Sequence, residues 1–381
     1  MKIRTITAGY NLSSPFQDSE EKMLTEIAKE TEQIKAYFEK NGYLVQTIRL
    51  STQPWESYAS TNSELQTVCS FLQTLCKRTI DYFNIGPISS VDHIPCLFSM
   101  LKGYPNGFCT VNLCNKDTIN HNLVLESAKL VKKISRVGTK GFTNLRFAAL
   151  CNVPALTPFY PASYHEGPPS FGIGCENSDI ISKVFSNATS YEDAWILLHE
   201  TLTKEYQRVE RIAREACSDS ILSFHGIDGS ISPSVKPEES LIHGIEQLLF
   251  VEYFGGPGSL AAARLITSVL QQLPVTTCGY NGLMLPVMED SGLADRNKEG
   301  KISLPKLLLY SSVCGTGLDT IPLPGDISVE TLQGILLDVA SLSIALKKPL
   351  SARLMPIPMK NAGDLTEFFF EYFKNTLVMN P

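Results

Sequence analysis

The side chains that could carry out chemistry lie in loops shaped by glycine and proline. One such loop runs from Cys314 through Asp319 to Asp326 and follows an apolar run, Leu307–Tyr310. A cysteine at a strand end beside glycine-rich backbone can be a nucleophile or a radical carrier, or simply a small buried thiol. Asp319 and Asp326 could bind a metal, orient a base or cap the loop.

Two further segments hold acid–base groups. Asp228 follows a predicted strand, Ile221–Ile227, and so lies where α/β folds place their ligand sites, although an Asx turn is the alternative. His165 lies in a proline-rich loop, Pro154–Pro169, and could be a general base, a metal ligand or a structural histidine. Both are therefore candidate catalytic residues, together with Cys314.

A divalent metal is possible but not required by any spacing. Asp228, Asp319 and Asp326 could supply carboxylate oxygens, and His165 an imidazole, to magnesium, manganese or calcium. The only cofactor that the sequence allows us to name is therefore this optional metal ion.

A glycine-rich segment, Phe254-Gly-Gly-Pro-Gly-Ser259, precedes an alanine-rich helix that we expect to extend to Gln271. Ser259 is the predicted N-cap. Gly256 and Gly258 would leave the first amides open to a carboxylate or phosphate. The alternative is a tight turn that lets the helix pack closely.

Two more residues are candidates for binding a ligand. Tyr280 lies in the turn Gly279-Tyr-Asn-Gly282. Arg353 is a rare charge in an apolar segment and could hold a carboxylate through its two parallel N–H groups, or could equally pair with Asp319 or Asp326. The ligand implied by these groups is small and anionic.

The elements that must position these loops alternate between strand and helix in the first part of the chain. Such a rhythm favours a largely parallel sheet covered by helices. The predicted strands are 3–8, 43–50, 82–86, 108–114 and 145–151, and the predicted helices are 18–41, 63–81, 92–102 and 121–137. Later elements are a strand at 171–176 and helices at 191–217 and 238–250.

Composition excludes several classes of protein. The 381 residues carry a net charge of −6, with 43% hydrophobic and 19% charged residues, so neither disorder nor a coiled coil describes the chain. The negative charge gives no reason to expect nucleic acid. No run of about 18 uncharged apolar residues indicates a membrane span. We therefore expect one domain, residues 1–381.

The termini and cysteines favour the cytoplasm. The first residues have no apolar core typical of a signal peptide, and the ten cysteines form no Cys-x-x-Cys pair. Most of the cysteines are then buried thiols in a reducing compartment. The aromatic segment Phe368–Phe373 favours a homo-oligomer, unless it is a last helix packed on the sheet.

Several blocks together give the chain its resemblance to a known family. It resembles the domain-of-unknown-function family seven-eleven over nearly its whole length. The blocks are Ile3-Arg-Thr-Ile-Thr7, Phe159-Tyr-Pro-Ala-Ser-Tyr-His165, Phe254-Gly-Gly-Pro-Gly-Ser-Leu-Ala-Ala-Ala263, Gly279-Tyr-Asn-Gly-Leu-Met-Leu-Pro-Val-Met-Glu-Asp290, Val313-Cys-Gly-Thr-Gly-Leu-Asp319 and Pro349-Leu-Ser-Ala-Arg-Leu354.

This resemblance implies a fold but no reaction. The family is similar in fold to the glycyl-radical enzymes of the pyruvate formate-lyase type, which have an α/β barrel of ten strands around an inner loop. Those enzymes carry a radical glycine in an Arg-Val-x-Gly-aromatic context near the C-terminus, and Ser351-Ala-Arg-Leu-Met-Pro356 lacks that glycine. Glycyl-radical chemistry is therefore not expected here.

Two functions remain open at this point. The first is a non-radical enzyme of lyase or hydrolase type that acts on a small carboxylate or carbonyl compound. The second is a protein that binds a small molecule, or regulates in response to it, without turnover. Both need a polar cavity built from the loops described above.

Overall fold

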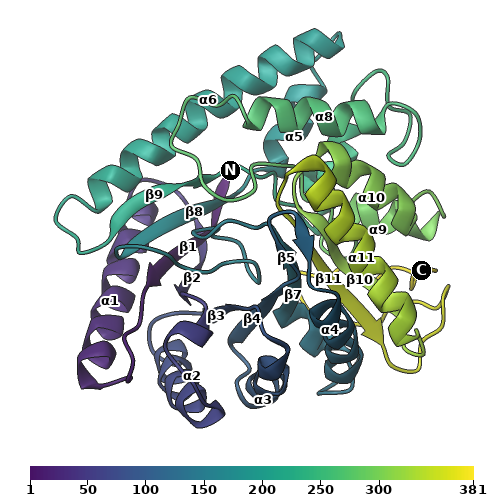
Figure 1. Ribbon diagram of the computed structural model, residues 1–381. Helices are drawn as coiled ribbons and strands as arrows, with labels where there is room; N and C mark the ends of the chain where they lie inside the picture. The colour runs from purple at the N-terminus through teal and green to yellow at the C-terminus, as the bar shows by residue number, and fades with distance from the viewer.

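The alternating elements of the first part of the chain build the parallel half of one sheet. The computed structural model describes residues 1–381, and in it five neighbouring strands run parallel (Figure 1). These are β1 (Lys2–Tyr10), β2 (Val45–Thr52), β3 (Tyr82–Ile88), β4 (Gly107–Asn112) and β7 (Phe147–Cys151). They are linked by α1 (Asp18–Lys40), α2 (Asn62–Cys76), α3 (Ile94–Gly103) and α4 (His121–Ile134). The predicted parallel sheet is confirmed in this half.

Two strand pairs extend this half in the opposite direction. On one side β8 (Ser170–Glu176) is antiparallel to β1, and β9 (Ser223–Asp228) is parallel to β8. On the other side β11 (Leu350–Ile357) is antiparallel to β7, and β10 (Gly317–Pro324) is parallel to β11. The result is a mixed nine-stranded sheet of order β10-β11-β7-β4-β3-β2-β1-β8-β9.

The predicted closed barrel of about ten strands is wrong, because the sheet is open between β9 and β10. Only isolated bridges span this gap: Ile227 pairs with Thr277, Ile231 with Leu283, and Pro286 with Asp319. The intervening segment contains Gly279, Gly282 and Pro286, and proline has no N–H to donate to a ladder. The segment therefore touches both edges of the sheet without forming a strand.

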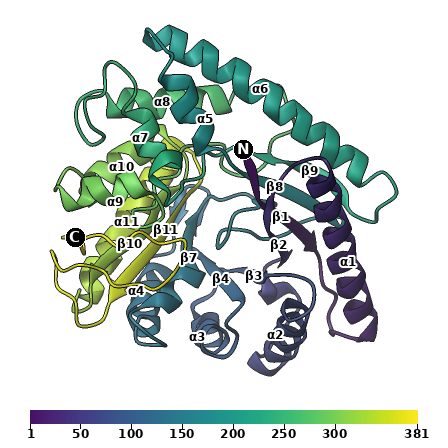
Figure 2. The ribbon, with the colours of Figure 1, turned by 180° about the vertical axis from the view of Figure 1, so that it is seen from behind.

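Helices cover the outer face of the curved sheet, as Figures 1 and 2 show from opposite sides. Beside α1–α4 these are α6 (Tyr191–Ala216), α8 (Ser259–Leu270), α10 (Leu304–Val313) and α11 (Val329–Leu346). By length and composition α11 is the one helix that could cross a membrane. Its buried side, with Leu332, Leu336 and Val339, belongs to the hydrophobic core.

The remaining helices are short, and two predictions fail among the later elements. They are α5 (Ser178–Phe185), α7 (Leu241–Ile245) and α9 (Ser291–Lys298). The helix predicted over 238–250 shrinks to α7, whose end is followed by turns. The apolar run Leu307–Tyr310 belongs to a helix, so Cys314 follows a helix rather than a strand.

Strand alternation separates an apolar outer face from a polar inner face. Ile48 and Leu50 of β2 belong to the hydrophobic core, whereas Thr47, Arg49 and Ser51 alternate with them and make polar contacts on the other side. The inner face is therefore lined with groups that can bind a polar molecule.

The proline-rich loop Pro154–Pro169 lies against this inner face. Thr7 Oγ1 donates to Pro158 O at 2.7 Å, Tyr160 Oη to Leu50 O at 2.5 Å, and Asn84 Nδ2 to Pro161 O at 2.6 Å. The loop is thus tied to β1, β2 and β3 and occupies part of the space that the sheet surrounds.

The aromatic segment near the C-terminus is not a helix, so the alternative of a last helix packed on the sheet is wrong. Phe368, Phe370 and Phe373 cluster around Phe142, with ring centroids 5.0–6.2 Å away, while Phe369 is 98% exposed. The segment therefore packs through three of its rings, and homo-oligomerisation stays a prediction.

Candidate functional site

A cavity with a volume of about 480 Å³ lies on the inner face of the sheet. Its walls come from strands β1, β2, β3, β4, β7, β10 and β11, from the inner loop, from the segment that bridges the sheet edges, and from the C-terminal aromatic segment. Six residues matter most for its chemistry: Arg49, Ser232, Tyr280, Glu289, Asp319 and Arg353. A cavity of this size suits a small organic molecule.

Arg49 is the one arginine of this wall whose charge and side-chain donors are left almost unused by the protein. Its guanidinium lies 5.0 Å from the ring centre of Tyr160 and 5.9 Å from that of Tyr82. Its only hydrogen bond runs from Nε to Thr47 Oγ1 at 3.0 Å, and no carboxylate lies within ion-pair distance. Burial lowers the pKa of Arg49 to about 10, because removal from water disfavours the cation.

The other three arginines of the wall have their donors used: Arg146 donates to three backbone carbonyl oxygens, and Arg4 and Arg353 are neutralised by carboxylates. Arg353 donates to Glu289 Oε1 at 2.7 Å and to Asp319 Oδ1 at 2.5 Å, and Arg4 donates to Glu289 Oε2 at 2.8 Å. Although burial opposes it, the two carboxylates hold the pKa of Arg353 above its ordinary value. Of the alternatives for Arg353, the pairing with Asp319 is the one that the structure shows.

Three buried hydroxyl groups of the wall have no hydrogen-bond partner. They belong to Ser232, Tyr280 and Thr316. Ser351 Oγ donates to Thr316 O at 2.9 Å and lies near the Tyr280 hydroxyl, but not in a position that makes a hydrogen bond with it. Burial raises the pKa of Tyr280, so this phenol is a proton donor at neutral pH.

His165 lies outside this cavity, beside a much smaller hollow that His225 also lines. Its Nε2 is 3.1 Å from Pro168 O and 3.2 Å from Gly167 O. A Cβ at Gly9 would come within 2.1 Å of His165 Nδ1, so only glycine fits there. Burial lowers the pKa of His165 to about 4, which makes the imidazole neutral and a weak base at pH 7.

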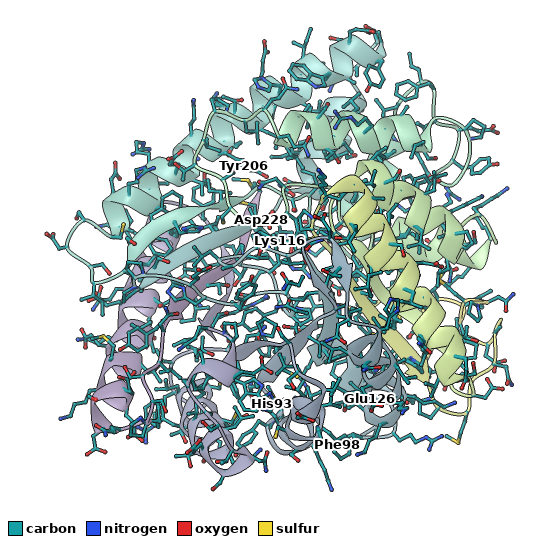
Figure 3. All side chains as sticks on the ribbon, viewed as in Figure 1. His93, Phe98, Lys116, Glu126, Tyr206 and Asp228 are labelled. Atoms are coloured by element: carbon teal, nitrogen blue, oxygen red, sulfur yellow. The ribbon has the colours of Figure 1, made fainter.

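Asp228 has a structural role, as the Asx-turn alternative suggested. It is fully buried, with Tyr206 of α6 nearby (Figure 3). Its carboxylate accepts from Ser230 N (3.0 Å), Ser230 Oγ (2.6 Å), Tyr280 N (2.8 Å) and Asn281 N (3.1 Å). Burial nevertheless raises its pKa. Asp228 thus holds the turn that carries Tyr280 and does not itself line the cavity.

The structure does not support Cys314 as a nucleophile. The side chain is 2% exposed, and burial raises the pKa of its thiol to about 12. A nucleophilic cysteine needs the opposite shift. All ten cysteines are free.

The glycine-rich start of α8 packs against its neighbours rather than facing the cavity. A Cβ at Gly258 would lie 2.2 Å from Phe250 O, and one at Gly256 would lie 2.8 Å from the Tyr253 ring. The N-cap is Gly258 instead of the predicted Ser259, whose Oγ accepts from Gly255 N at 3.0 Å. Gly256, Gly258 and Ser259 are absent from the cavity wall, and the tight-turn alternative describes their contacts.

The predicted metal ligands do not come together. Asp319 lines the cavity, Asp228 is enclosed by the turn, and Asp326 is exposed. No three His, Cys, Asp or Glu side chains form a group that could hold a metal ion. These residues therefore give no geometric support to the proposed ion.

Sequence reasoning identified Asp319, Tyr280 and Arg353 for this cavity but missed Arg49, Ser232 and Glu289. A signal for Arg49 did exist, because it is the only charged residue of the strand Val45–Thr52 and shares a face with Thr47 and Ser51. No comparable signal marks Ser232 or Glu289, which lie in irregular segments.

The fold and the site define an α/β protein with an open mixed sheet and an arginine-containing cavity on its inner face. Comparison with known proteins gives the family. The model of the family described as Uncharacterised ACR (DUF711) matches residues 1–373, and the chain belongs to this family.

The relatives of this chain carry only a family-level name. A UPF0210 protein of Acetivibrio thermocellus is 26% identical over 403 residues, covering 97% of this chain and 88% of the relative. One from Pyrobaculum aerophilum is 29% identical over 277 residues, covering 70% of this chain and 59% of the relative. These names state no reaction, so a function must be argued from the cavity.

Proposed function

We propose that the cavity binds a small organic anion through Arg49, and that the protein is a non-radical enzyme of lyase or hydrolase type acting on a small carboxylate or carbonyl compound. The observation that carries this proposal is the guanidinium of Arg49, which lines the cavity without a carboxylate partner. In the same wall, Arg4 and Arg353 are already paired with carboxylates, and the donors of Arg146 are taken up by backbone carbonyl oxygens.

The physical reason is the free energy of a partly desolvated cation. Burial disfavours the charged form of Arg49, and the faces of Tyr82 and Tyr160 compensate only in part. A carboxylate or phosphate oxygen placed on the free Nη atoms would make charge-assisted hydrogen bonds, which are stronger than neutral ones. An anionic ligand therefore gains the most binding free energy beside Arg49, because the protein supplies no carboxylate to this guanidinium.

The chemistry would use the acidic groups of the same wall. Asp319 and Glu289 line the cavity and can exchange protons with a bound molecule. Elimination and hydrolysis of small carboxylates need such groups beside an anion clamp. His165 and Cys314 take no part in this proposal.

Binding without turnover is the second candidate. Both oxygens of Glu289 and one oxygen of Asp319 already accept hydrogen bonds from arginines. A carboxylate held in this way is a poorer base, which favours a cavity that recognises its ligand and leaves it unchanged.

Two broader expectations accompany the proposal. A cytoplasmic location is supported by the ten free cysteines. The likeness to the glycyl-radical enzyme fold is supported by the loop on the inner face of the sheet. Nothing in either expectation requires radical chemistry.

The test is binding followed by turnover. Pyruvate, lactate, malate and citrate are titrated calorimetrically against the wild type and the variant Arg49→Gln, with Arg78→Gln as control because Arg78 is exposed and outside the cavity. Loss of a charged hydrogen bond of about 1.5–3 kcal/mol predicts binding about 10- to 150-fold weaker for Arg49→Gln alone.

Each acid that binds is then incubated with the protein and followed by proton NMR. A new product supports the enzyme, and binding without product from any acid supports the second candidate. Equal affinity in the wild type and Arg49→Gln, or no binding by any acid, would contradict the proposed role of Arg49.

A further inference from the structure

Two groups of aromatic rings line the cavity that contains Arg49. The first group is Tyr82, Phe108 and Tyr160, which come from β3, β4 and the inner loop. The ring centroids of Tyr82 and Phe108 are 5.5 Å apart, and those of Phe108 and Tyr160 are 5.1 Å apart. Because the guanidinium of Arg49 lies against the rings of Tyr82 and Tyr160, an anion bound there lies beside this group.

The second group consists of Phe142 and two rings of the C-terminal aromatic segment, Phe370 and Tyr372. The ring centroids of Phe142 and Phe370 are 5.0 Å apart, and those of Phe370 and Tyr372 are 5.4 Å apart. Tyr372 lies near Tyr82 of the first group. The two groups therefore approach each other at the cavity, although they come from distant parts of the chain.

Ring surface in both groups is accessible to a ligand. Tyr372 is 39% exposed, and Tyr82, Phe142 and Phe370 are half-buried. All four line the cavity. Apolar ring surface in contact with water is unfavourable, and its concentration in a cavity is typical of ligand sites. The four rings thus offer the ligand an aromatic surface close to its anion-binding group.

We infer that the ligand of the cavity is an aromatic carboxylic acid, whose ring packs on these aromatic side chains while Arg49 binds its carboxylate. This inference rests on the proposed function, since it takes Arg49 to be the anion-binding group. Aromatic rings favour tilted and edge-to-face contacts with one another, which stabilise a pair of rings beyond the burial of their area. An aliphatic acid gains only the burial.

The dimensions of the cavity agree with such a ligand. A three-carbon acid such as pyruvate would contact Arg49 and leave most of the 480 Å³ and the ring surface uncovered. The guanidinium of Arg49 lies 5.9 Å from the centre of the Tyr82 ring. A short spacer between ring and carboxylate therefore lets one molecule contact both groups.

The experiment compares acids that differ in the aromaticity of one ring. Benzoate is titrated calorimetrically against cyclohexanecarboxylate, and 3-phenylpropanoate against 3-cyclohexylpropanoate. The two acids of a pair have the same number of carbons, the same ring size and one carboxylate, and the cyclohexane ring buries at least as much apolar area. We expect the aromatic acid of each pair to bind about two- to twelvefold more tightly, and Arg49→Gln to weaken the binding of all four acids.

The variant Tyr372→Leu removes one ring and keeps an apolar side chain. It weakens the binding of 3-phenylpropanoate about two- to twelvefold and changes that of 3-cyclohexylpropanoate by less than about twofold. Tyr191→Leu is the matched control, because Tyr191 is similarly exposed, at 36%, but lies outside the cavity. This control binds both acids as the wild type does.

The outcomes separate this inference from the proposed function. If the cyclohexyl acids bind as tightly as their aromatic partners, or Tyr372→Leu weakens both acids equally, the ligand class is wrong while a loss of affinity in Arg49→Gln still supports the role of Arg49. If the small acids of the first experiment bind and none of these four does, the inference alone is overturned. If Arg49→Gln binds the four acids as tightly as the wild type, the proposed function is wrong, and the inference fails with it.

Discussion

Acidification should destabilise this protein through one histidine, His165. The imidazole is 2% exposed, its Nε2 lies 3.1–3.2 Å from two carbonyl oxygens, and its Nδ1 faces the backbone at Gly9. Burial lowers the pKa of His165, and the hydrogen bonds with the two carbonyl oxygens raise it by a smaller amount. A proton on Nδ1 would therefore place a charge where neither water nor an acceptor can reach it.

The size of the effect follows from the two pKa values. The ordinary value is 6.5 and the value in the folded protein is about 4. Between these two pH values the imidazole of His165 is protonated in the unfolded chain and neutral in the folded chain. The free energy of unfolding therefore falls as the pH decreases from 6.5 to about 4. The limiting loss is about 3 kcal/mol, of which roughly 2 kcal/mol has been lost by pH 4.5.

Urea denaturation at pH 7, 6, 5 and 4.5 measures this loss. The variant His165→Asn keeps a donor for the carbonyl oxygens but cannot titrate, so its stability should change with pH by roughly 2 kcal/mol less than that of the wild type. His121→Asn, at an exposed position, is the control. Identical pH slopes for the wild type and His165→Asn would refute the reasoning. His225, whose pKa is also lowered by burial, adds a smaller loss of the same sign, and His225→Asn separates it.

Three further predictions concern stability and reactivity. Gly279→Ala should lower the free energy of unfolding by about 3 kcal/mol or more, because the φ of Gly279 is +72° and a Cβ there would lie 2.1 Å from Asp228 Oδ2. Gly42→Ala is the control and should cost about 1 kcal/mol, since Gly42 has a φ of +88° but open space around it. Equal losses in the two variants would contradict this account. Arg353→Met should cost about 3–5 kcal/mol of unfolding free energy in urea, since it leaves the half-buried Asp319 without an ion-pair partner and the buried Glu289 with Arg4 alone. A loss below about 1 kcal/mol would argue against the ion-pair network. Cys314→Ala should leave the rate of thiol labelling by Ellman's reagent at pH 8 unchanged, because burial holds the pKa of Cys314 at about 12, and slower labelling would show that this thiol is reactive.

Local periodicity was enough to predict the parallel half of the sheet. The helix from Asp18 shows its buried side at Leu24, Ile27 and Ile34, and the observed α1 ends within one residue of the prediction. The later elements were harder to predict because turns and prolines interrupt them. A short apolar run such as Leu307–Tyr310 fits either a strand or a helix, so its sequence does not distinguish them. Only the tertiary structure shows that this run belongs to α10.

The candidate site was likewise predicted only in part. Glycine and proline signals correctly marked the segments that hold Tyr280, Asp319 and the inner loop, since these residue types restrict the backbone locally. They also marked the start of α8, where the same glycines serve close packing. Glycine and proline therefore indicate where the backbone makes turns or close contacts, but they do not show whether that segment lines a cavity or packs against a neighbouring element.

What the sequence determined by itself is the set of elements whose cause is local: the strand–helix alternation, the buried helix faces and the stiffened loops. What only the tertiary structure decided is which side chains are left without partners. Arg49 on its strand resembles any exposed arginine until the curved sheet and the inner loop enclose it between Tyr82 and Tyr160. Asp319 is neutralised only because Arg353, distant in the sequence, reaches it, and Glu289 lies between Arg353 and Arg4. The pairing of charges across 34 and 64 residues depends on strand order and register, which no local pattern contains.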